Sequence, residues 1–174
     1  MKSGRAWFSE CGTYRYALLR CIDLGLDGLD GSQGRCLNVV MLNPSTADAT
    51  QDDPTIRRCI GYARRWGYGE LMVTNLFGFR ATEPAVMKAA ADPIGPENDA
   101  RILEIAQHAS AVVVAWGIHG AHRGRDQQVL AMLHAADISP LCLGTTKGGQ
   151  PKHPLYLSAG LSPVAFEQRQ AVAP

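Results

Sequence analysis

Long apolar runs, paired cysteines and a strong net charge are all missing from this chain of 174 residues. No apolar run approaches the roughly 18 residues that a membrane-spanning helix needs. The N-terminal residues MKSGRAWFSECG also lack the apolar stretch of a secretory signal. None of the five cysteines forms a C-x-x-C pair, so we expect reduced thiols rather than disulfides or zinc ligands. These absences predict a cytoplasmic protein with no membrane partner.

The charges nearly cancel, because 17 Lys and Arg face 16 Asp and Glu, for a net charge of +1. That balance excludes a polycation that binds nucleic acid by charge alone. The Walker spacing G-x-x-x-x-G-K-[ST] is absent, and no G-x-G-x-x-G follows a predicted strand, so no nucleotide cofactor is expected. The histidines at 119, 122 and 134 include no i, i+4 pair, so no metal is expected either.

The length favours one domain, large enough to form a core without disulfides or metals. We predict a single domain over residues 1–174, with a β-hairpin and loop at 1–35, a core at 36–158 and a tail at 159–174. The hairpin prediction depends on the stretch CGTYRYALLRCIDL, which the Gly- and Asp-rich LGLDGLDGSQG follows. The second arm of this hairpin is expected to enter the core.

Four short segments are almost continuously apolar, which is typical of strands covered on both faces in a parallel sheet. They span 37–42, 71–75, 111–116 and 140–143. Helical patterns alternate with them and indicate right-handed βαβ units. The fold class that follows is α/β, a three-layer α/β/α sandwich around a four-stranded parallel sheet.

The first of the predicted helices has clear end signals. Asp53 can cap it, Pro54 suits its first position and Gly67 ends it. Its apolar side begins at Ile56, while four arginines occupy the opposite side. Two further helices are expected at about 96–109, burying Ile102, Leu103 and Ala106, and at about 126–136, burying Val129, Leu130 and Leu133.

Open parallel sheets bind ligands beyond the carboxyl ends of their strands, so the residues just after each strand are the candidates for a site. Polar residues and glycines gather after all four predicted strands. We expect catalytic roles for Asn43, His153 and Asp48. We expect substrate binding by Pro44, Ser45, Asn75, Phe77, Arg80, Gly117, Lys147 and Tyr156.

Each main candidate has a chemical reason and a plainer alternative. Asn43 can hold a water molecule or a substrate amide, or simply form an Asx-type turn. Asn75 ends a very apolar strand, so its amide needs a backbone or ligand partner. His153 precedes a proline, which favours an extended backbone, and can donate to an oxyanion or to local backbone. Asp48, together with Asp52 and Asp53, can activate water, bind a metal or cap the helix.

The segments MLNPSTADA, DDPTIRRC, VTNLFGFRAT, AWGIHG and LGTTKGGQPKHPLYL resemble a bacterial and phage family known only as domain of unknown function number sixteen-forty-three. A more distant resemblance, to the uracil-DNA glycosylase superfamily, is carried by Asn43-Pro44, Thr74-Asn75 and His153-Pro154. It implies a three-layer fold in which Asn43 positions the attacking water, Asn75 reads the base edge and His153 donates to the departing base. The chain departs from that superfamily at Leu155, where a serine is common, and in lacking an obvious wedge loop.

Three functions remain open from the sequence. The first is an enzyme that recognises a nucleobase or nucleotide and hydrolyses an N-glycosidic bond. The second is a non-catalytic module for a nucleobase, nucleotide or single-stranded nucleic acid. Its basic residues would be Arg80, Arg123, Arg125, Lys147 and Lys152. The third is a metal-assisted hydrolase that uses the three aspartates. The oligomeric state is not predicted.

Overall fold

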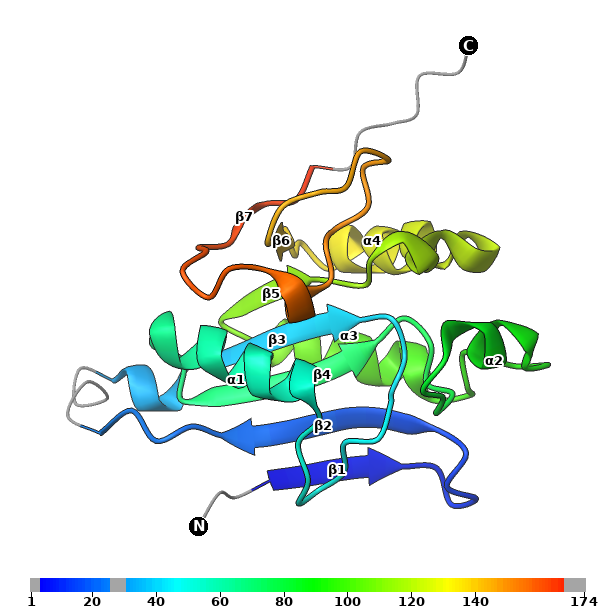
Figure 1. The fold of residues 1–174 in the computed structure, drawn as a ribbon, viewed down its shortest axis with the longest axis horizontal. Coiled ribbons are helices and arrows are strands. Elements are labelled where there is room, and N and C mark those ends of the chain that lie inside the picture. The colour runs from blue at the N-terminus through cyan, green and yellow to red at the C-terminus, as the bar shows by residue number, and fades with distance from the viewer. Residues whose placement is uncertain (1–3, 26–30, 168–174) are drawn as a thin grey trace.

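The computed structural model describes residues 4–25 and 31–167 as a mixed sheet with helices on both faces (Figure 1). The strands are β1 (Gly4–Phe8), β2 (Arg15–Cys21), β3 (Cys36–Met41), β4 (Glu70–Asn75), β5 (Ala111–Val114), β6 (Leu141–Cys142) and β7 (Val164–Ala165). The helices are α1 (Pro54–Arg65), α2 (Pro84–Ala89), α3 (Asn98–His108) and α4 (Arg125–Ala135).

The sheet has seven strands in the order β1-β2-β4-β3-β5-β6-β7. The four predicted apolar segments became β3, β4, β5 and β6, which pair in parallel. The expected sheet of four strands is nevertheless too small, because antiparallel strands extend it at both edges. The N-terminal hairpin β1-β2 pairs directly with β4, and the predicted tail contributes β7. Residues 26–30 and 168–174 of the predicted loop and tail lie outside the described residues.

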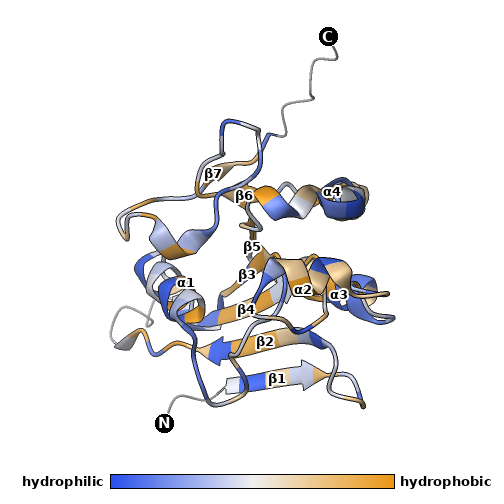
Figure 2. Ribbon diagram, turned by 45° about the vertical axis from the view of Figure 1, so that its right-hand side comes forward, coloured by the Kyte–Doolittle hydropathy of each residue, from blue (hydrophilic) through white to orange (hydrophobic). Residues whose placement is uncertain are grey.

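Alternation along the central strands produces two separate apolar layers. On β3, Val39 and Met41 face the layer that α1 covers, while Val40 faces the layer that α3 and α4 cover. Figure 2 shows apolar residues gathered on the central strands between α1 on one side and α3 and α4 on the other. Burial on both faces explains why the strands of the parallel region are apolar without alternation.

Helix α1 begins and ends as predicted. The Asp53 carboxylate accepts a hydrogen bond from the Ile56 backbone N–H over 2.8 Å, and Pro54 occupies the first turn. Gly67 has φ of +74°, the left-handed conformation that ends many helices. Helices α3 and α4 also match their predicted positions, although α3 buries Ile105 where Leu103 had been expected. Helix α2 was not predicted.

Within the described ranges, no helix is both long and apolar enough to cross a membrane. All five cysteines are free thiols, as the spacing predicted. The structure therefore depends on the two apolar layers rather than on covalent links.

Candidate functional site

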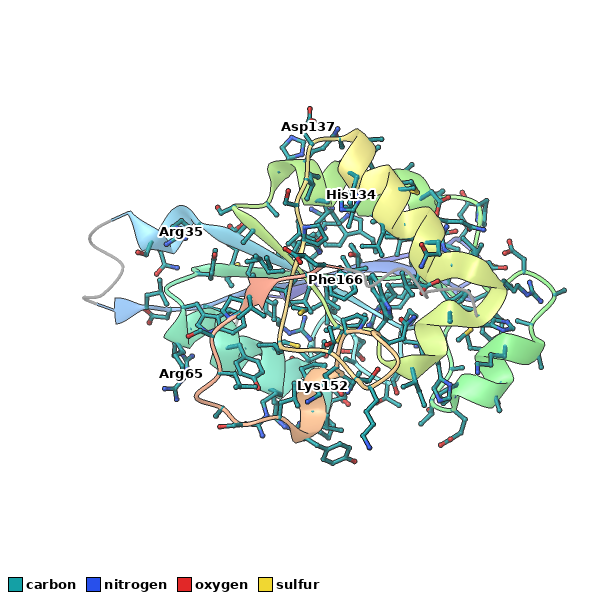
Figure 3. All side chains as sticks on the ribbon, turned by 90° about the horizontal axis from the view of Figure 1, so that it is seen from above. Arg35, Arg65, His134, Asp137, Lys152 and Phe166 are labelled. Atoms are coloured by element: carbon teal, nitrogen blue, oxygen red, sulfur yellow. The ribbon has the colours of Figure 1, made fainter. Side chains whose placement is uncertain are left out.

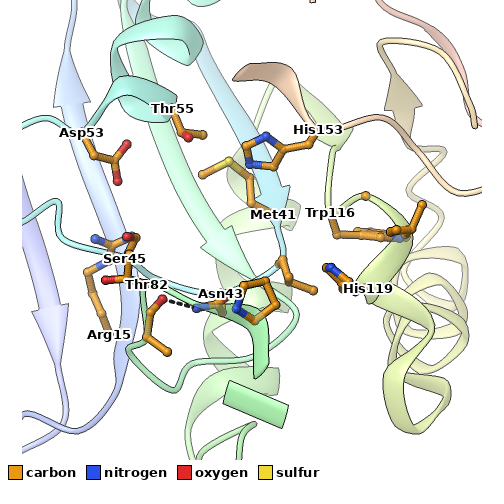
Figure 4. Close-up of a pocket in the computed structure, with 15 residues that line it drawn as sticks. Arg15, Met41, Asn43, Ser45, Asp53, Thr55, Thr82, Trp116, His119 and His153 are labelled. Carbon is orange, nitrogen blue, oxygen red and sulfur yellow. Dashed lines mark hydrogen bonds between the residues drawn. The ribbon is translucent and has the colours of Figure 1, made fainter. Parts of the chain in front are cut away.

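A cavity of about 360 Å³ lies beyond the carboxyl ends of β3 and β5, where the sequence predicted a site. Its volume is at the small end of the range for ligand pockets, about 300–1,000 Å³. The loops that follow β3, β4 and β5 reach it, together with the loop that holds His153 (Figure 4). The lining residues are Arg15, Met41, Leu42, Asn43, Ser45, Asp53, Thr55, Ala81, Thr82, Pro84, Trp116, Gly117, Ile118, His119 and His153.

Asn43 is fixed at the cavity by two hydrogen bonds from its side-chain nitrogen. Nδ2 donates to the Ala81 carbonyl over 2.7 Å and to the Pro44 carbonyl over 3.1 Å. Because both partners can only accept, the amide nitrogen and oxygen are assigned without ambiguity. Oδ1 remains as an acceptor at the cavity wall, where it can orient a water molecule.

His153 enters the cavity from the loop beyond β6, and its ring lies beside Met41 in Figure 4. Its Nδ1 accepts from the Leu155 backbone N–H over 3.4 Å. Loss of solvent around the imidazole lowers the pKa of His153, and the negative charge of Asp53 only partly opposes that shift. The ring is therefore neutral near pH 7, with Nε2–H as its donor.

Trp116 forms an apolar wall that is held in a single orientation. The indole Nε1 donates to the Gln150 side chain over 2.8 Å, and Gln150 in turn donates to Asp126 over 2.7 Å. A Cβ on Gly120 would stand 2.1 Å from Trp116 Cδ1, so only glycine allows this packing. Only 1% of Trp116 is exposed, so the indole closes this side of the cavity as a fixed apolar wall.

Arg15 supplies a positive charge to the opposite wall although it is only 1% exposed. It donates from Nη1 to the Ala47 carbonyl, while its Nε has no hydrogen-bond partner among residues 4–25 and 31–167. Burial lowers the pKa of Arg15 to about 10, so it remains charged at neutral pH. Over the described ranges no carboxylate forms an ion pair with it. Burying a charged group with so few hydrogen-bond partners costs free energy, and a ligand that accepts from the free N–H would reduce that cost.

Asp53 lines the same cavity and has two functions available to it. One carboxylate oxygen, Oδ1, caps α1 through the Ile56 N–H. The other oxygen has no partner among the described residues. Its charge acts on both Arg15 and His153. The cavity thus combines one buried cation, one carboxylate and the imidazoles of His119 and His153.

The structure brings together part of the predicted set. Asn43, Ser45, Gly117 and His153 all line the cavity. Asn75 does not line it, and its side chain is fully buried. Neither amide atom has a hydrogen-bond partner within the described part of the chain. Asn75 pairs in register with Met41, which does line the cavity.

The remaining predicted residues also lie outside the lining. Asp48 uses its Oδ1 to accept from the backbone of Thr50 and Gln51, which lowers its pKa. Phe77 is buried in the layer below α2, and Pro44 is buried beside Asn43. Three other predicted residues are exposed away from the lining, namely Arg80, Lys147 and Tyr156.

The predicted basic set and the predicted acidic cluster are dispersed. Arg125 is buried, donates to the Leu76 carbonyl and pairs with Asp99, so it cannot meet a phosphate. Asp52 pairs with Arg20 over 2.6 Å. No group of three or more metal-ligating side chains occurs in the part of the chain that the structure describes.

Sequence reasoning missed Arg15, Trp116, Thr55 and Thr82 as cavity residues. Arg15 and Trp116 lie in apolar segments that predict strands. A single arginine or tryptophan in such a segment does not distinguish a cavity residue from an ordinary strand residue. One signal for Arg15 was available, because it lies between Tyr14 and Tyr16 in the hairpin arm that was expected to enter the core. Arginine is almost never buried without a partner, so a buried arginine indicates a nearby polar site.

Helices on both faces of a mixed sheet, and a cavity beyond its parallel strands, define an α/β protein of the open-sheet class. Residues 15–155 match the model of a family described as "Protein of unknown function (DUF1643)". That match covers most of the chain, which therefore belongs to this family, as the sequence motifs indicated. No curated protein and no solved structure matches the chain.

Proposed function

We propose that this protein binds a nucleobase in the cavity and hydrolyses the N-glycosidic bond that joins the base to a sugar. The observation that carries the proposal is the joint presence of Asn43 and His153 in one small cavity that the indole of Trp116 also lines. The same two residues carry the resemblance to the uracil-DNA glycosylase superfamily. The proposal assigns to Asn43 and His153 the roles in hydrolysis that this resemblance implies.

His153 supplies the donor for the leaving group. Breaking the glycosidic bond sends the bonding electron pair to the base, which leaves as an anion. A hydrogen bond from Nε2–H to a carbonyl oxygen of that base stabilises the anion, and a bond of this charge-assisted kind contributes roughly 1.5–3 kcal/mol. The lowered pKa of His153 keeps the imidazole neutral, and its Nε2–H is the donor to the departing base.

Asn43 and Asp53 supply the water. The free Oδ1 of Asn43 accepts a hydrogen bond from a water molecule and orients its lone pair toward the sugar carbon. As that carbon forms its new C–O bond, the proton of the water passes to the unpartnered oxygen of Asp53. Asp53 then releases this proton, which reaches the base anion through solvent. The products are the neutral base and a sugar with a hydroxyl at its former glycosidic carbon.

Arg15 and Trp116 recognise the base in this proposal. Trp116 closes one wall of the cavity with an apolar indole, and Arg15 has an Nε–H without a partner among the described residues. The Nε–H of Arg15 complements a carbonyl acceptor on the edge of the base. Arg15 would take the role that the sequence assigned to Asn75, which stays beneath the cavity.

The test is release of free base from a panel of single-stranded DNA, RNA and nucleosides that contain uracil, hypoxanthine or alkylated bases. We expect release from at least one class, reduced more than 100-fold by His153→Gln and by Asn43→Ala. His134→Gln, an exposed histidine on α4, is the matched control and should retain full activity. No release across the panel, with a known glycosylase active beside it, would contradict the enzymatic proposal.

A non-catalytic nucleobase-binding module is the second candidate. It is favoured by the hydrogen bond from the Ile56 N–H to Asp53, because a carboxylate that caps α1 already has a structural role and need not act as a base. It predicts that a free base binds and that Arg15→Met abolishes the binding, while no base is ever released. Calorimetry with free bases separates the two functions.

A further inference from the structure

A second hollow, of about 400 Å³, adjoins the cavity along the outer side of α1. Helix α1 forms one wall, and the segment that follows His153 forms the other. The residues that line it are Pro54, Arg57, Arg58, Gly61, Tyr62, Arg65, Leu155 and Ala159. We call it the α1 groove.

The α1 groove is strongly basic. Helix α1 carries four arginines and no Asp or Glu between Pro54 and Arg65. Three of the four line the groove, and none of them forms an ion pair over the stretches 4–25 and 31–167. Arg57 donates only to the Asp52 backbone carbonyl. Guanidinium groups gathered without counter-charges favour an anionic partner with several charges.

The opposite wall is held firmly against α1. The Tyr62 hydroxyl donates to the Ser158 carbonyl over 2.8 Å, and the Trp66 Nε1 donates to the Leu161 carbonyl over 3.0 Å. This wall also presents Tyr156, which is 91% exposed. Figure 3 shows Arg65 and Lys152 on the same side of the molecule, with α1 and this wall between them.

The α1 groove and the cavity are lined by residues that are close together in the chain. Pro54 lines the groove and its neighbour Thr55 lines the cavity. On the other wall, His153 lines the cavity and Leu155 lines the groove. A chain of phosphates lying along α1 would therefore place one of its bases at the mouth of the cavity.

We infer that the α1 groove binds the backbone of single-stranded nucleic acid, with a base stacked on Tyr156. A positive groove beside an exposed aromatic ring is the combination by which proteins hold single strands. A single strand also leaves its bases free to enter the cavity, whereas a duplex keeps them paired and stacked. This inference rests on the proposed function, because it names the polymer that brings the base.

The test is fluorescence anisotropy with labelled 20-nucleotide dT and rU strands and a 20-base-pair duplex, in a salt series. We expect both single strands to bind more tightly than the duplex. Tyr156→Ala should weaken binding roughly 5- to 150-fold while Tyr156→Phe preserves it, since base stacking needs only the ring. Arg58→Gln with Arg65→Gln should reduce the slope of log affinity against log salt by about 1.4, or about 0.7 for each lost phosphate contact.

The matched control is Arg5→Gln with Arg101→Gln, which removes the same charge from β1 and α3. An equal loss of affinity in this control would overturn the inference, because general charge would then explain binding. Equal affinity for the duplex, or binding only to anionic vesicles, would also overturn it. Base release from nucleosides without strand binding would refute the groove alone. Strand binding without any base release would uphold the groove and refute the proposed enzyme.

Discussion

The side-chain nitrogen of Asn43 donates to the backbone carbonyl of Ala81 over 2.7 Å, and this bond joins the loop after β3 to the loop after β4. The Ala81 backbone N–H returns a hydrogen bond to the Pro44 carbonyl over 2.9 Å. The two loops are thus held at a fixed separation on one side of the cavity. The same amide keeps its oxygen available for the water molecule of the proposed reaction. Asn43 would therefore serve both the stability of the loops and the proposed catalysis.

Asn43→Ala should therefore reduce both stability and activity. Two hydrogen bonds are lost and two carbonyl groups lose a donor, so the free energy of unfolding should fall by about 1–2 kcal/mol. Denaturant unfolding measures that fall, and base release is compared at a temperature where both proteins are folded. Thr46→Ala, at an exposed site in the same loop, should change stability by less than about 0.5 kcal/mol. An Asn43→Ala protein as stable as the parent would contradict the structural role.

Arg15→Met should separate ligand binding from stability. The arginine is a buried charge without an ion pair, so its removal costs little more than the hydrogen bond to Ala47. We expect the free energy of unfolding to fall by no more than about 1 kcal/mol, while base binding falls at least tenfold. Calorimetry and denaturant unfolding of the same preparation give both values.

Arg125→Met is the matched control for that experiment. Arg125 is equally buried, but it pairs with Asp99 and donates to the Leu76 carbonyl. Its loss should cost about 2–3 kcal/mol of stability and leave base binding unchanged in the folded protein. If Arg15→Met proved as destabilising as Arg125→Met, Arg15 would be a structural residue.

The order of strands and helices was predictable because its signals are local. Unbroken apolar runs marked the parallel strands, and the Asp53-Pro54 pair marked the start of α1. The size of the sheet was not predictable in the same way. Strand β7 is two residues long, and its place depends on pairing with β6 rather than on any pattern of its own.

The candidate site was predictable in position and only partly in composition. Residues just after the strands, such as Asn43 and Gly117, could be placed because a parallel sheet directs all its carboxyl ends to one edge. Asn75 occupies such a position too, yet its side chain points into the interior. Arg15 reaches the cavity from an antiparallel strand, and no rule about parallel strands could have placed it there.

Gly120→Ala should disturb Trp116 because its new methyl group would overlap the indole ring. We expect a loss of about 1–3 kcal/mol in stability, as in other overpacked sites, and a shift in tryptophan fluorescence. Gly61→Ala is the matched control, since a Cβ there meets nothing within 4 Å on α1. That helical substitution should stabilise the protein by about 0.5–1 kcal/mol. Equal effects of the two substitutions on stability would show that the indole of Trp116 can shift to make room for the added methyl group.

His153 should make both function and stability sensitive to acid. Burial lowers its pKa below the ordinary value of about 6.5, so between that value and the lower folded pKa the unfolded chain binds more protons than the folded one. The contribution of His153 to the free energy of unfolding should consequently be fully present above about pH 6.5. It should decline as the pH falls toward the pKa of His153 in the folded chain. Protonation of Nδ1 would also remove its bond to the Leu155 N–H.

His153→Gln isolates this contribution from that of His122, whose pKa burial also lowers. The variant should show a flatter decline of unfolding free energy between pH 7 and pH 5 than the parent protein. Two-dimensional NMR of the imidazole carbons gives the pKa of each histidine directly. A His153 that titrates at or above about pH 6.5, the ordinary histidine value, would mean that the ring is solvated. The folded and unfolded chains would then bind the same number of protons at His153, and the predicted loss of stability in acid would have to be abandoned.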